Sequence, residues 1–279
     1  MTQEVRFLLV GVGNVGRRFL ELLVRKEDTL RDALGLALIP VGVADTSGAA
    51  VCATGLDLEQ LIRLKGEGQG VAHTPRWGCQ GLTPLEMVEG IEADLLLEAS
   101  PGNLEDGQPG LGCIEAALSR GMHVVTANKA PLVLAFPRLL ALARENGVQL
   151  RFDATVAGGL PAVNLGQRDL AAAEIHRLEG IVNLTTNYIL TRMAQDGLSY
   201  EQALLDAQEA GHAETDPTVD VEGWDAANKL VILAHSVLGY PASRKELTVE
   251  GILGVTAETL ERAAAEGKRV KLVAAAEQQ

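Results

Sequence analysis

The fold is decided near the N-terminus by the stretch FLLVGVGNVG, residues 7–16. A short apolar segment, residues 5–10, enters the glycine turn, and apolar residues at helical spacing follow it, which predicts a strand, a turn and a helix. This order is the context that a G-x-G-x-x-G motif needs to bind a dinucleotide. A glycine-rich turn without a ligand is the alternative that the motif alone leaves open.

Each glycine of the motif has a separate physical task. Gly11 permits the tight turn, Gly13 lets the backbone approach a pyrophosphate, and Gly16 allows close packing of the helix. The phosphate charge would meet the positive end of the helix dipole. The predicted cofactor-binding residues of this loop are Gly11, Gly13, Asn14, Val15 and Gly16.

Strand-like and helical patterns alternate over the first half of the chain. Further strands are predicted at residues 36–44, 94–98 and 124–126, and helices at residues 111–119 and 132–146. The alternation predicts an α/β fold with a Rossmann-type parallel sheet. A loop rich in Gly and Pro, residues 100–110, follows the third strand on the side where open sheets bind ligands, which adds Ser100 to the cofactor-binding candidates.

The alternation stops near residue 150, where we place a domain boundary. Residues 1–150 would form a dinucleotide-binding domain, and residues 151–279 a second, α+β domain for catalysis and dimerisation. In the second domain, helices are predicted at residues 186–195, 199–209 and 224–238, and strands at residues 177–182, 247–252 and 269–275.

Composition limits the classes of partner. The 279 residues are 47% hydrophobic, enough for a sizeable core, and the formal net charge of −13 disfavours binding to nucleic acid.

We find no secretion signal and no apolar run near the ~20 residues of a membrane span, so we expect a cytoplasmic protein without a membrane partner. Three widely spaced cysteines favour reduced thiols over a disulfide framework.

Two charged residues follow predicted strands at the carboxyl edge of the sheet. Asp45 could accept hydrogen bonds from the adenosine ribose and would repel a 2′-phosphate, which favours NAD over NADP. A solvated turn residue fits the same position. Lys129 follows the strand at residues 124–126 and would face the nicotinamide, although a solvent-exposed loop lysine is equally compatible with the pattern.

The segment GHAETDPTVDVEGWDAANK, residues 211–229, contains the strongest group of polar residues. Asp225 and Lys229 are four residues apart and share one face of a predicted helix. A lysine held there could protonate an oxygen that gains negative charge, and the carboxylate could orient it or bind substrate. Spacing alone favours an ordinary surface salt bridge, worth about 0.2–0.5 kcal/mol.

Two further runs suggest binding to small polar species. TVAGGLP, residues 155–161, could present carbonyl oxygens to a hard cation such as Na⁺, or form a strained turn. GIVNLTTNYIL, residues 180–190, offers amides and hydroxyls to a polar substrate, or caps a helix. The histidines lack metal-ligand spacing, so no catalytic metal is expected.

A resemblance to a known family joins these segments. VVTANKAPL, TVAGGLP, EGIVNLTTNYIL and AGHAETDPTVDVEGWDAANKL resemble, in order and separation, the signature blocks of homoserine dehydrogenases. The resemblance runs from the first strand to the last residue. It implies that NAD or NADP serves the interconversion of L-homoserine and L-aspartate 4-semialdehyde, in threonine and methionine biosynthesis. It also implies a homodimer.

The resemblance assigns roles to particular residues. Lys229 matches the catalytic lysine, Asp225 the acidic residue beside it, and Lys129 the lysine between nicotinamide and substrate. A structural sodium ion would lie on main-chain oxygens of the glycine-rich turn. The residues matched to the substrate are Glu214, Asp220, Asn183 and Thr185, and those matched to sodium are Val156, Gly158 and Leu160.

Three departures from the family pattern are visible. The family's glutamate before the glycine-rich turn is Asp153 here. The loop at residues 103–110 is longer and richer in glycine, which suggests a subgroup whose substrate could be a related small amino alcohol. The chain also ends before segments that complete the family's catalytic sheet, and it shows no ACT-like regulatory domain. A non-catalytic dinucleotide-binding homologue is therefore the alternative.

Overall fold

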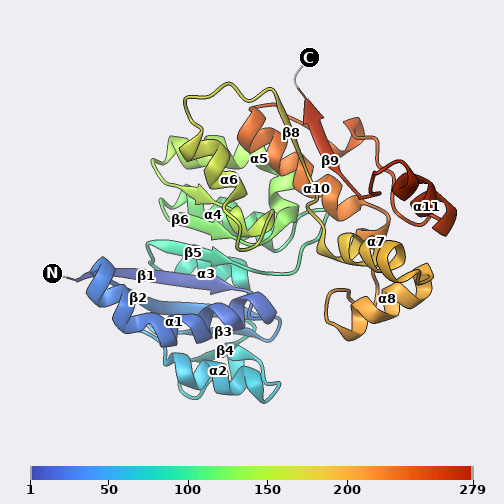
Figure 1. Cartoon of the computed structure of the whole chain (residues 1–279). Coiled ribbons are helices and arrows are strands. Elements are labelled where there is room, and N and C mark those ends of the chain that lie inside the picture. The colour runs from blue at the N-terminus through green and yellow to red at the C-terminus, as the bar shows by residue number, and fades with distance from the viewer. Residues whose placement is uncertain (1, 278–279) are drawn as a thin grey trace. The chain divides into compact units, whose positions relative to one another are not determined.

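The computed structural model describes residues 2–277 and consists of two compact units, Met1–Gly159 and Leu160–Gln279 (Figure 1). The first unit contains a seven-stranded sheet of order β4-β3-β2-β1-β5-β6-β7. Strands β2, β1, β5, β6 and β7 are parallel, and β3 and β4 extend the sheet in antiparallel pairing. The strands are β1 (Gln3–Val10), β2 (Leu36–Asp45), β3 (Gly48–Val51), β4 (Gly78–Gln80), β5 (Leu95–Glu98), β6 (His123–Thr126) and β7 (Leu150–Arg151).

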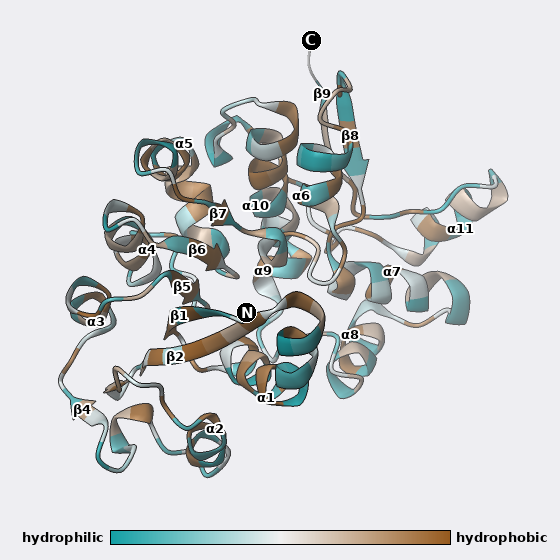
Figure 2. Cartoon of the chain, turned by 90° about the vertical axis from the view of Figure 1, so that its left-hand side faces the viewer, coloured by the Kyte–Doolittle hydropathy of each residue, from teal (hydrophilic) through white to brown (hydrophobic). Residues whose placement is uncertain are grey.

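Helices cover both faces of this sheet. Helices α1 and α2 lie on one face, and α3, α4 and α5 follow one another on the other (Figure 2). The central strands are buried on both sides, and Phe7, Leu9 and Val43 form a core with Leu20 and Leu23 of α1. The helical elements are α1 (Asn14–Leu34), α2 (Leu58–Gly66), η1 (Val71–His73), α3 (Pro84–Gly90), α4 (Gly110–Ser119), α5 (Lys129–Glu145) and η2 (Asp153–Thr155).

The strand order determines where a ligand can bind. Strand β1 lies between β2 and β5, so the chain moves outward in opposite directions from the centre of the sheet. Loops that follow neighbouring strands diverge at this point and leave a crevice at the carboxyl edge, which is where open α/β sheets bind ligands. The predicted Rossmann-type fold is confirmed.

The second unit contains a helical layer and a two-stranded antiparallel sheet, β8-β9. Helix α10 packs on that sheet through Ala226 and Leu230, which contact Ala274 of β9. Helices α7 and α8 share another core, with Ile189, Leu190 and Ala203. The elements are α6 (Ala162–Asn164), η3 (Leu165–Asp169), β8 (Arg177–Gly180), α7 (Leu184–Asp196), α8 (Tyr200–Glu209), α9 (Thr218–Val221), α10 (Trp224–Leu233), η4 (Ala234–Leu238), η5 (Arg244–Glu246), α11 (Ala257–Ala265) and β9 (Ala274–Glu277).

Two predicted strands of the second unit are wrong in whole or in part. Residues 247–252 form no strand, because Ile252 N bonds Val221 O of α9 and a Cβ built on Gly251 would lie 2.3 Å from that oxygen. The strand predicted at residues 269–275 begins only at Ala274. Its partner β8 ends at Gly180, which pairs with Ala274, so the preceding residues have no strand beside them.

Candidate functional site

The glycine loop connects β1 to α1. Gly11 has φ +93°, and a Cβ there would lie 2.4 Å from the Ala99 carbonyl; a Cβ on Gly16 would lie 2.0 Å from Gly11 O. The fold therefore requires both of these glycines. Gly13 differs, because its φ is −78° and a Cβ would meet no atom of the described chain within 4 Å.

The N-terminus of α1 is open beside Gly13. Gly13 is the N-cap and provides no side-chain hydrogen bond to the helix, and Gly13, Asn14 and Val15 are all exposed. Uncapped N–H groups at the start of a long helix favour an anion. The arrangement fits a dinucleotide pyrophosphate, for which Gly13 would leave room.

Buried polar residues join the ends of β5 and β6 at the same edge of the sheet. Glu98 is 1% exposed and accepts hydrogen bonds from Ser100 N at 2.9 Å, from Ser100 Oγ, and from Thr126 Oγ1 at 2.7 Å. Asn128 caps α5 through Ala130 N, and Lys129, half-buried, is the first residue of that helix. Sequence analysis missed Glu98, although a charged residue ending the apolar strand LLLE was a usable signal.

Asp45, the last residue of β2, is fully engaged within the protein. Its Oδ1 accepts from Ser47 N and Oγ, and its Oδ2 from Lys65 Nζ at 2.7 Å and Val71 N at 3.1 Å. Burial alone would raise the pKa of Asp45, but the bonds from Lys65, Ser47 and Val71 outweigh it and lower the pKa below its ordinary value. A carboxylate has about four acceptor positions, and all four are used here.

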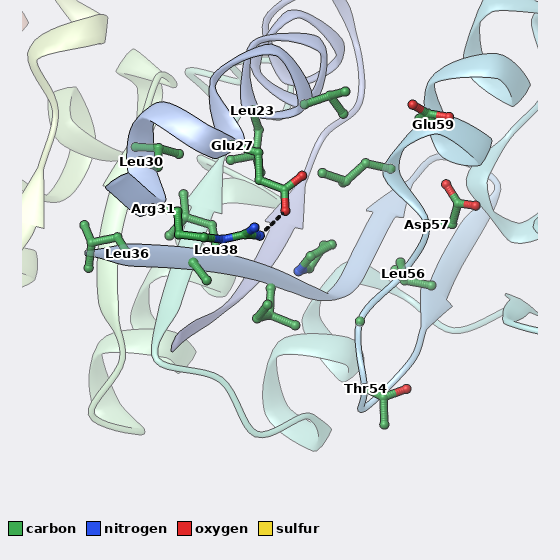
Figure 3. Close-up of a pocket in the computed structure, with 16 residues that line it drawn as sticks. Leu23, Glu27, Leu30, Arg31, Leu36, Leu38, Thr54, Leu56, Asp57 and Glu59 are labelled. Atoms are coloured by element: carbon green, nitrogen blue, oxygen red, sulfur yellow. Dashed lines mark hydrogen bonds and ion pairs between the residues drawn. The ribbon is translucent and has the colours of Figure 1, made fainter. Parts of the chain in front are cut away.

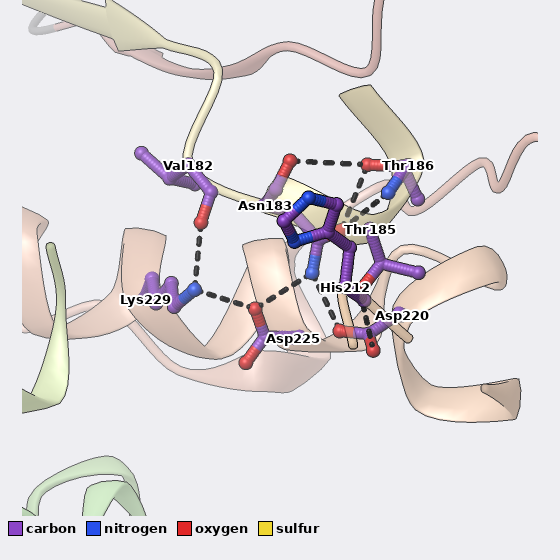
Figure 4. A network of polar contacts seen from close by, with 8 residues as sticks. All are labelled: Val182, Asn183, Thr185, Thr186, His212, Asp220, Asp225 and Lys229. Atoms are coloured by element: carbon purple, nitrogen blue, oxygen red, sulfur yellow. Dashed lines mark hydrogen bonds and ion pairs between the residues drawn. The ribbon is translucent and has the colours of Figure 1, made fainter. Parts of the chain in front are cut away.

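In the second unit, Lys229 lies in a polar network at the start of α10. Its Nζ is 2.6 Å from Asp225 Oδ2 and donates a hydrogen bond of 2.6 Å to Val182 O (Figure 4). The side chains of Lys229 and Asp225 are only 16% and 8% exposed. The pair is therefore not the ordinary surface salt bridge that the spacing alone favours.

Asn183 connects this pair to the neighbouring residues of the network. Its Nδ2 donates to Asp225 Oδ2 at 2.9 Å and to Asp220 Oδ1 at 2.5 Å, while its Oδ1 caps α7 through Thr186 N (Figure 4). The single hydroxyl hydrogen of Thr185 has two acceptors within reach, His212 O at 2.7 Å and Asp220 Oδ2 at 3.2 Å. The helix-cap interpretation of residues 180–190 is confirmed, and the cap also positions two carboxylates.

Other predicted site residues lie outside this network. Glu214 is exposed in the segment between α8 and α9, and its carbonyl oxygen accepts from Gln208 Nε2 at 3.0 Å. Of the three predicted sodium ligands, Val156 and Gly158 belong to the first unit and Leu160 to the second. Leu160 O accepts a hydrogen bond from Ala162 N at 2.9 Å.

A cavity of about 530 Å³ lies elsewhere in the first unit, lined by the second half of α1, the beginning of β2 and residues 54–59 (Figure 3). Leu23, Leu38 and Leu56 line it, and the Glu27–Arg31 ion pair lies at its side. It is at the opposite end of β2 from Asp45. None of the predicted site residues lines it.

Two structural features are absent from residues 2–277. No helix there is long and apolar enough to cross a membrane. In the same range, no three His, Cys, Asp or Glu side chains are grouped as metal ligands.

Known protein families match both units of the chain. The family model "Homoserine dehydrogenase, NAD binding domain" matches residues 11–153, and the model "Homoserine dehydrogenase" matches residues 161–279. A homoserine dehydrogenase of Methanocaldococcus jannaschii is 40% identical over 266 residues, which cover 95% of this chain and 79% of the relative. The chain belongs to the homoserine dehydrogenase family.

Two more members of the homoserine dehydrogenase family show the extent of the similarity. The NAD(+)-dependent homoserine dehydrogenase of Pseudomonas canavaninivorans is 36% identical over 98% of this chain and 77% of its own length. The crystal structure of a putative homoserine dehydrogenase from Archaeoglobus fulgidus is 40% identical, with a TM-score of 0.88 over 98% of this chain and 81% of that one. The family resemblance that the sequence motifs indicated is confirmed.

Proposed function

We propose that this protein is an NAD(P)-dependent homoserine dehydrogenase that interconverts L-homoserine and L-aspartate 4-semialdehyde in threonine and methionine biosynthesis. The observation that carries the proposal is the half-buried amino group of Lys229, held by Asp225 and by Val182 O. Its family membership, with an NAD-binding domain at residues 11–153, supports the class of reaction.

Lys229 would act as the acid and base of this reaction. The cofactor, when bound, supplies a hydride to the aldehyde carbon or accepts one from the alcohol. An ammonium has three donors, and Val182 O and Asp225 Oδ2 engage two of those on Lys229. The third can donate to the substrate oxygen during reduction, which leaves Lys229 as a neutral amine, and in the reverse direction the neutral amine takes a proton from the alcohol oxygen during oxidation.

The acidic residues Asp220 and Glu214 of the second unit suit a substrate that carries an ammonium group. Asp220 is held by Asn183 and Thr185, so its position is fixed before a substrate arrives. We assign Asp220 and Glu214 to the amino group, with Asn183 and Thr185 as positioning residues. An exposed Glu214 is compatible with this role, since a substrate must reach it.

For the cofactor, the first unit fits a dinucleotide at Gly13 and the N-terminus of α1, and we propose a preference for NAD. The charge of Asp45 would repel a 2′-phosphate. Lys65 beside it has the opposite effect, and a ribose hydroxyl must replace one of the four bonds that Asp45 accepts. Asp45→Ala should therefore lower the ratio of kcat/KM for NAD to that for NADP, and Lys65→Ala should raise it.

A spectrophotometric assay tests the main proposal. Purified protein should reduce NAD⁺ or NADP⁺ when L-homoserine is added at alkaline pH. If NADH binds but no amino alcohol is oxidised, the protein is a non-catalytic homologue. Turnover with a different small amino alcohol, without turnover of homoserine, would assign it to a related dehydrogenase.

We also propose a structural Na⁺ ion and a homodimer in the cytoplasm. Carbonyl oxygens, such as those of Val156, Gly158 and Leu160, are the ligands that hard cations prefer.

The free cysteines Cys52, Cys79 and Cys113 suit a reducing compartment such as the cytoplasm. The homodimer is what the resemblance to the homoserine dehydrogenase family implies. Thermal unfolding in NaCl, compared with thermal unfolding in LiCl, tests the sodium ion. Light scattering, which measures the mass of the protein in solution, tests the dimer.

A further inference from the structure

Glu98 is a buried carboxylate that the proposed chemistry does not use. It ends β5 with 1% exposure, and the hydrogen-bond partners described above, Ser100 and Thr126, are neutral donors. A Cβ built on Gly110 would lie 3.0 Å from Glu98 Oε1, so the carboxylate lies against the N-terminus of α4. Burying a carboxyl group is unfavourable unless hydrogen-bond donors satisfy its oxygens, and Ser100 and Thr126 supply such donors here.

The hydrogen bonds of Glu98 hold the turn that follows β5 and the turn that follows β6. On the β5 side it accepts from both Ser100 N and Ser100 Oγ, which sets the direction of the serine hydroxyl. On the β6 side it accepts from Thr126 Oγ1, and this oxygen in turn accepts from Asn128 N at 3.0 Å. Asn128 then caps α5, whose first residue is Lys129.

The glycine loop packs against the same place. Ala99 N donates to Val10 O at 2.7 Å, and a Cβ on Gly11 would lie 2.5 Å from Ser100 N. The turns that follow β1, β5 and β6 therefore meet above a single carboxylate. These are the turns at the carboxyl edge of the sheet, where a dinucleotide binds.

We propose that Glu98 is a positioning residue for the nicotinamide end of the cofactor. Its carboxyl oxygens hold Ser100 and the turn before Lys129 in the arrangement that receives the carboxamide-bearing ring. This inference rests on the proposed function, because it assumes a nicotinamide dinucleotide in the first unit. It does not require that homoserine be the substrate.

The test compares Glu98→Gln with Glu92→Gln, a control at an exposed residue. Glu98→Gln retains the size of the side chain but replaces one acceptor oxygen by a donor facing Thr126. We expect the Kd for NADH, measured by fluorescence, and the KM for the oxidised cofactor to rise about tenfold. The KM for homoserine should stay within about twofold of wild type, since no contact in the second unit changes.

Thr126→Val provides a second route to the same conclusion if Glu98→Gln folds poorly. It removes one of the hydroxyls that Glu98 holds and should weaken NADH binding in the same direction. Wild-type NADH affinity in either folded variant would overturn the proposal. So would equal rises of both KM values with a lowered Tm, which would indicate a purely structural role.

The two proposals fail in different ways. The NADH titration needs no turnover, so it reports on Glu98 alone. A wild-type protein that does not oxidise homoserine, combined with weaker NADH binding by Glu98→Gln, would reject the proposed reaction and support the role of Glu98.

Discussion

The Nζ atom of Lys229 lies 2.6 Å from Oδ2 of Asp225, one turn earlier on α10, in a contact from which solvent is largely excluded. The same Nζ donates to Val182 O, in the segment that leads from β8 into α7. Helix α10 and the segment between β8 and α7 thus both hold the side-chain nitrogen of Lys229 before any substrate binds. Preorganised donors of this kind are what charge development on a substrate oxygen requires.

Replacing Lys229 should therefore remove turnover and leave cofactor binding intact. For Lys229→Ala we expect kcat to fall about 10²–10⁴-fold, the range for loss of a general acid or base. The Kd for NADH should not change, because its binding residues lie in the first unit. Lys268→Ala, at a side chain that is 71% exposed, is the matched control. Turnover of Lys229→Ala near the wild-type rate would reject its role.

The glycine loop provides a matched pair of substitutions. Gly13→Ala should retain the wild-type free energy of unfolding but weaken NADH binding at least tenfold, because its Cβ has room in the protein and would enter the pyrophosphate space. Gly16→Ala should destabilise the fold, since its Cβ would lie 2.0 Å from Gly11 O. Urea unfolding and NADH titration of both variants separate the two effects. Unchanged NADH affinity in Gly13→Ala would place the cofactor elsewhere.

Much of the first unit could be predicted because its central strands are continuous apolar runs. Strands β1, β2, β5 and β6 were all predicted from such runs. Strands β3, β4 and β7 were not, since they have only four, three and two residues and the sequences GAAV, GCQ and LR carry no alternation. The tight turn after Asp45 pairs β3 with β2, whereas β4 begins at Gly78, far along the chain from the end of β3 at Val51.

In the candidate site, too, features that depend on neighbouring residues were predicted, whereas contacts between residues far apart in the sequence were not. The spacing of Asp225 and Lys229 predicted a shared helix face, but the hydrogen bond to Asp225 comes from Asn183, which is 42 residues from Asp225 in the chain. The role of Asp45 was inferred without Lys65, which lies 20 residues away and pairs with it. The sequence identifies the residue types and their order. The hydrogen-bond and ion-pair partners that change their pKa or exposure are brought to them by tertiary packing.

The cysteines should differ strongly in reactivity. Burial raises the pKa of the Cys113 thiol to about 12, with Glu98 and Glu89 adding to the effect, so very little thiolate forms at neutral pH. Cys79 is exposed. Iodoacetamide at pH 8 followed by peptide mass spectrometry should modify Cys79 in the folded protein and Cys113 only after denaturation. Modification of Cys113 at the same rate as Cys79 would contradict the burial of α4.

Asp45 should make stability depend on pH in the acid range. Its pKa is lowered in the folded protein, so the unfolded chain binds the proton more tightly and the ionised carboxylate stabilises the fold. This contribution is present above the ordinary pKa of 3.8 and is lost as the pH falls below it toward the folded value. Asp45→Asn removes the charge-assisted bonds from Lys65, Ser47 and Val71, worth about 1–3 kcal/mol.

The difference in unfolding free energy between wild type and Asp45→Asn should therefore be largest near pH 7 and shrink near pH 3. Urea unfolding at a series of pH values measures it directly. Asp32→Asn, at an exposed position of α1, is the control and should follow the wild-type curve. Because Lys65 donates to Asp45, Lys65→Met should reproduce part of the loss at pH 7, and adding it to Asp45→Asn should cost little more. A pH-independent difference for Asp45→Asn would mean that packing, and not the carboxylate charge, stabilises the end of β2.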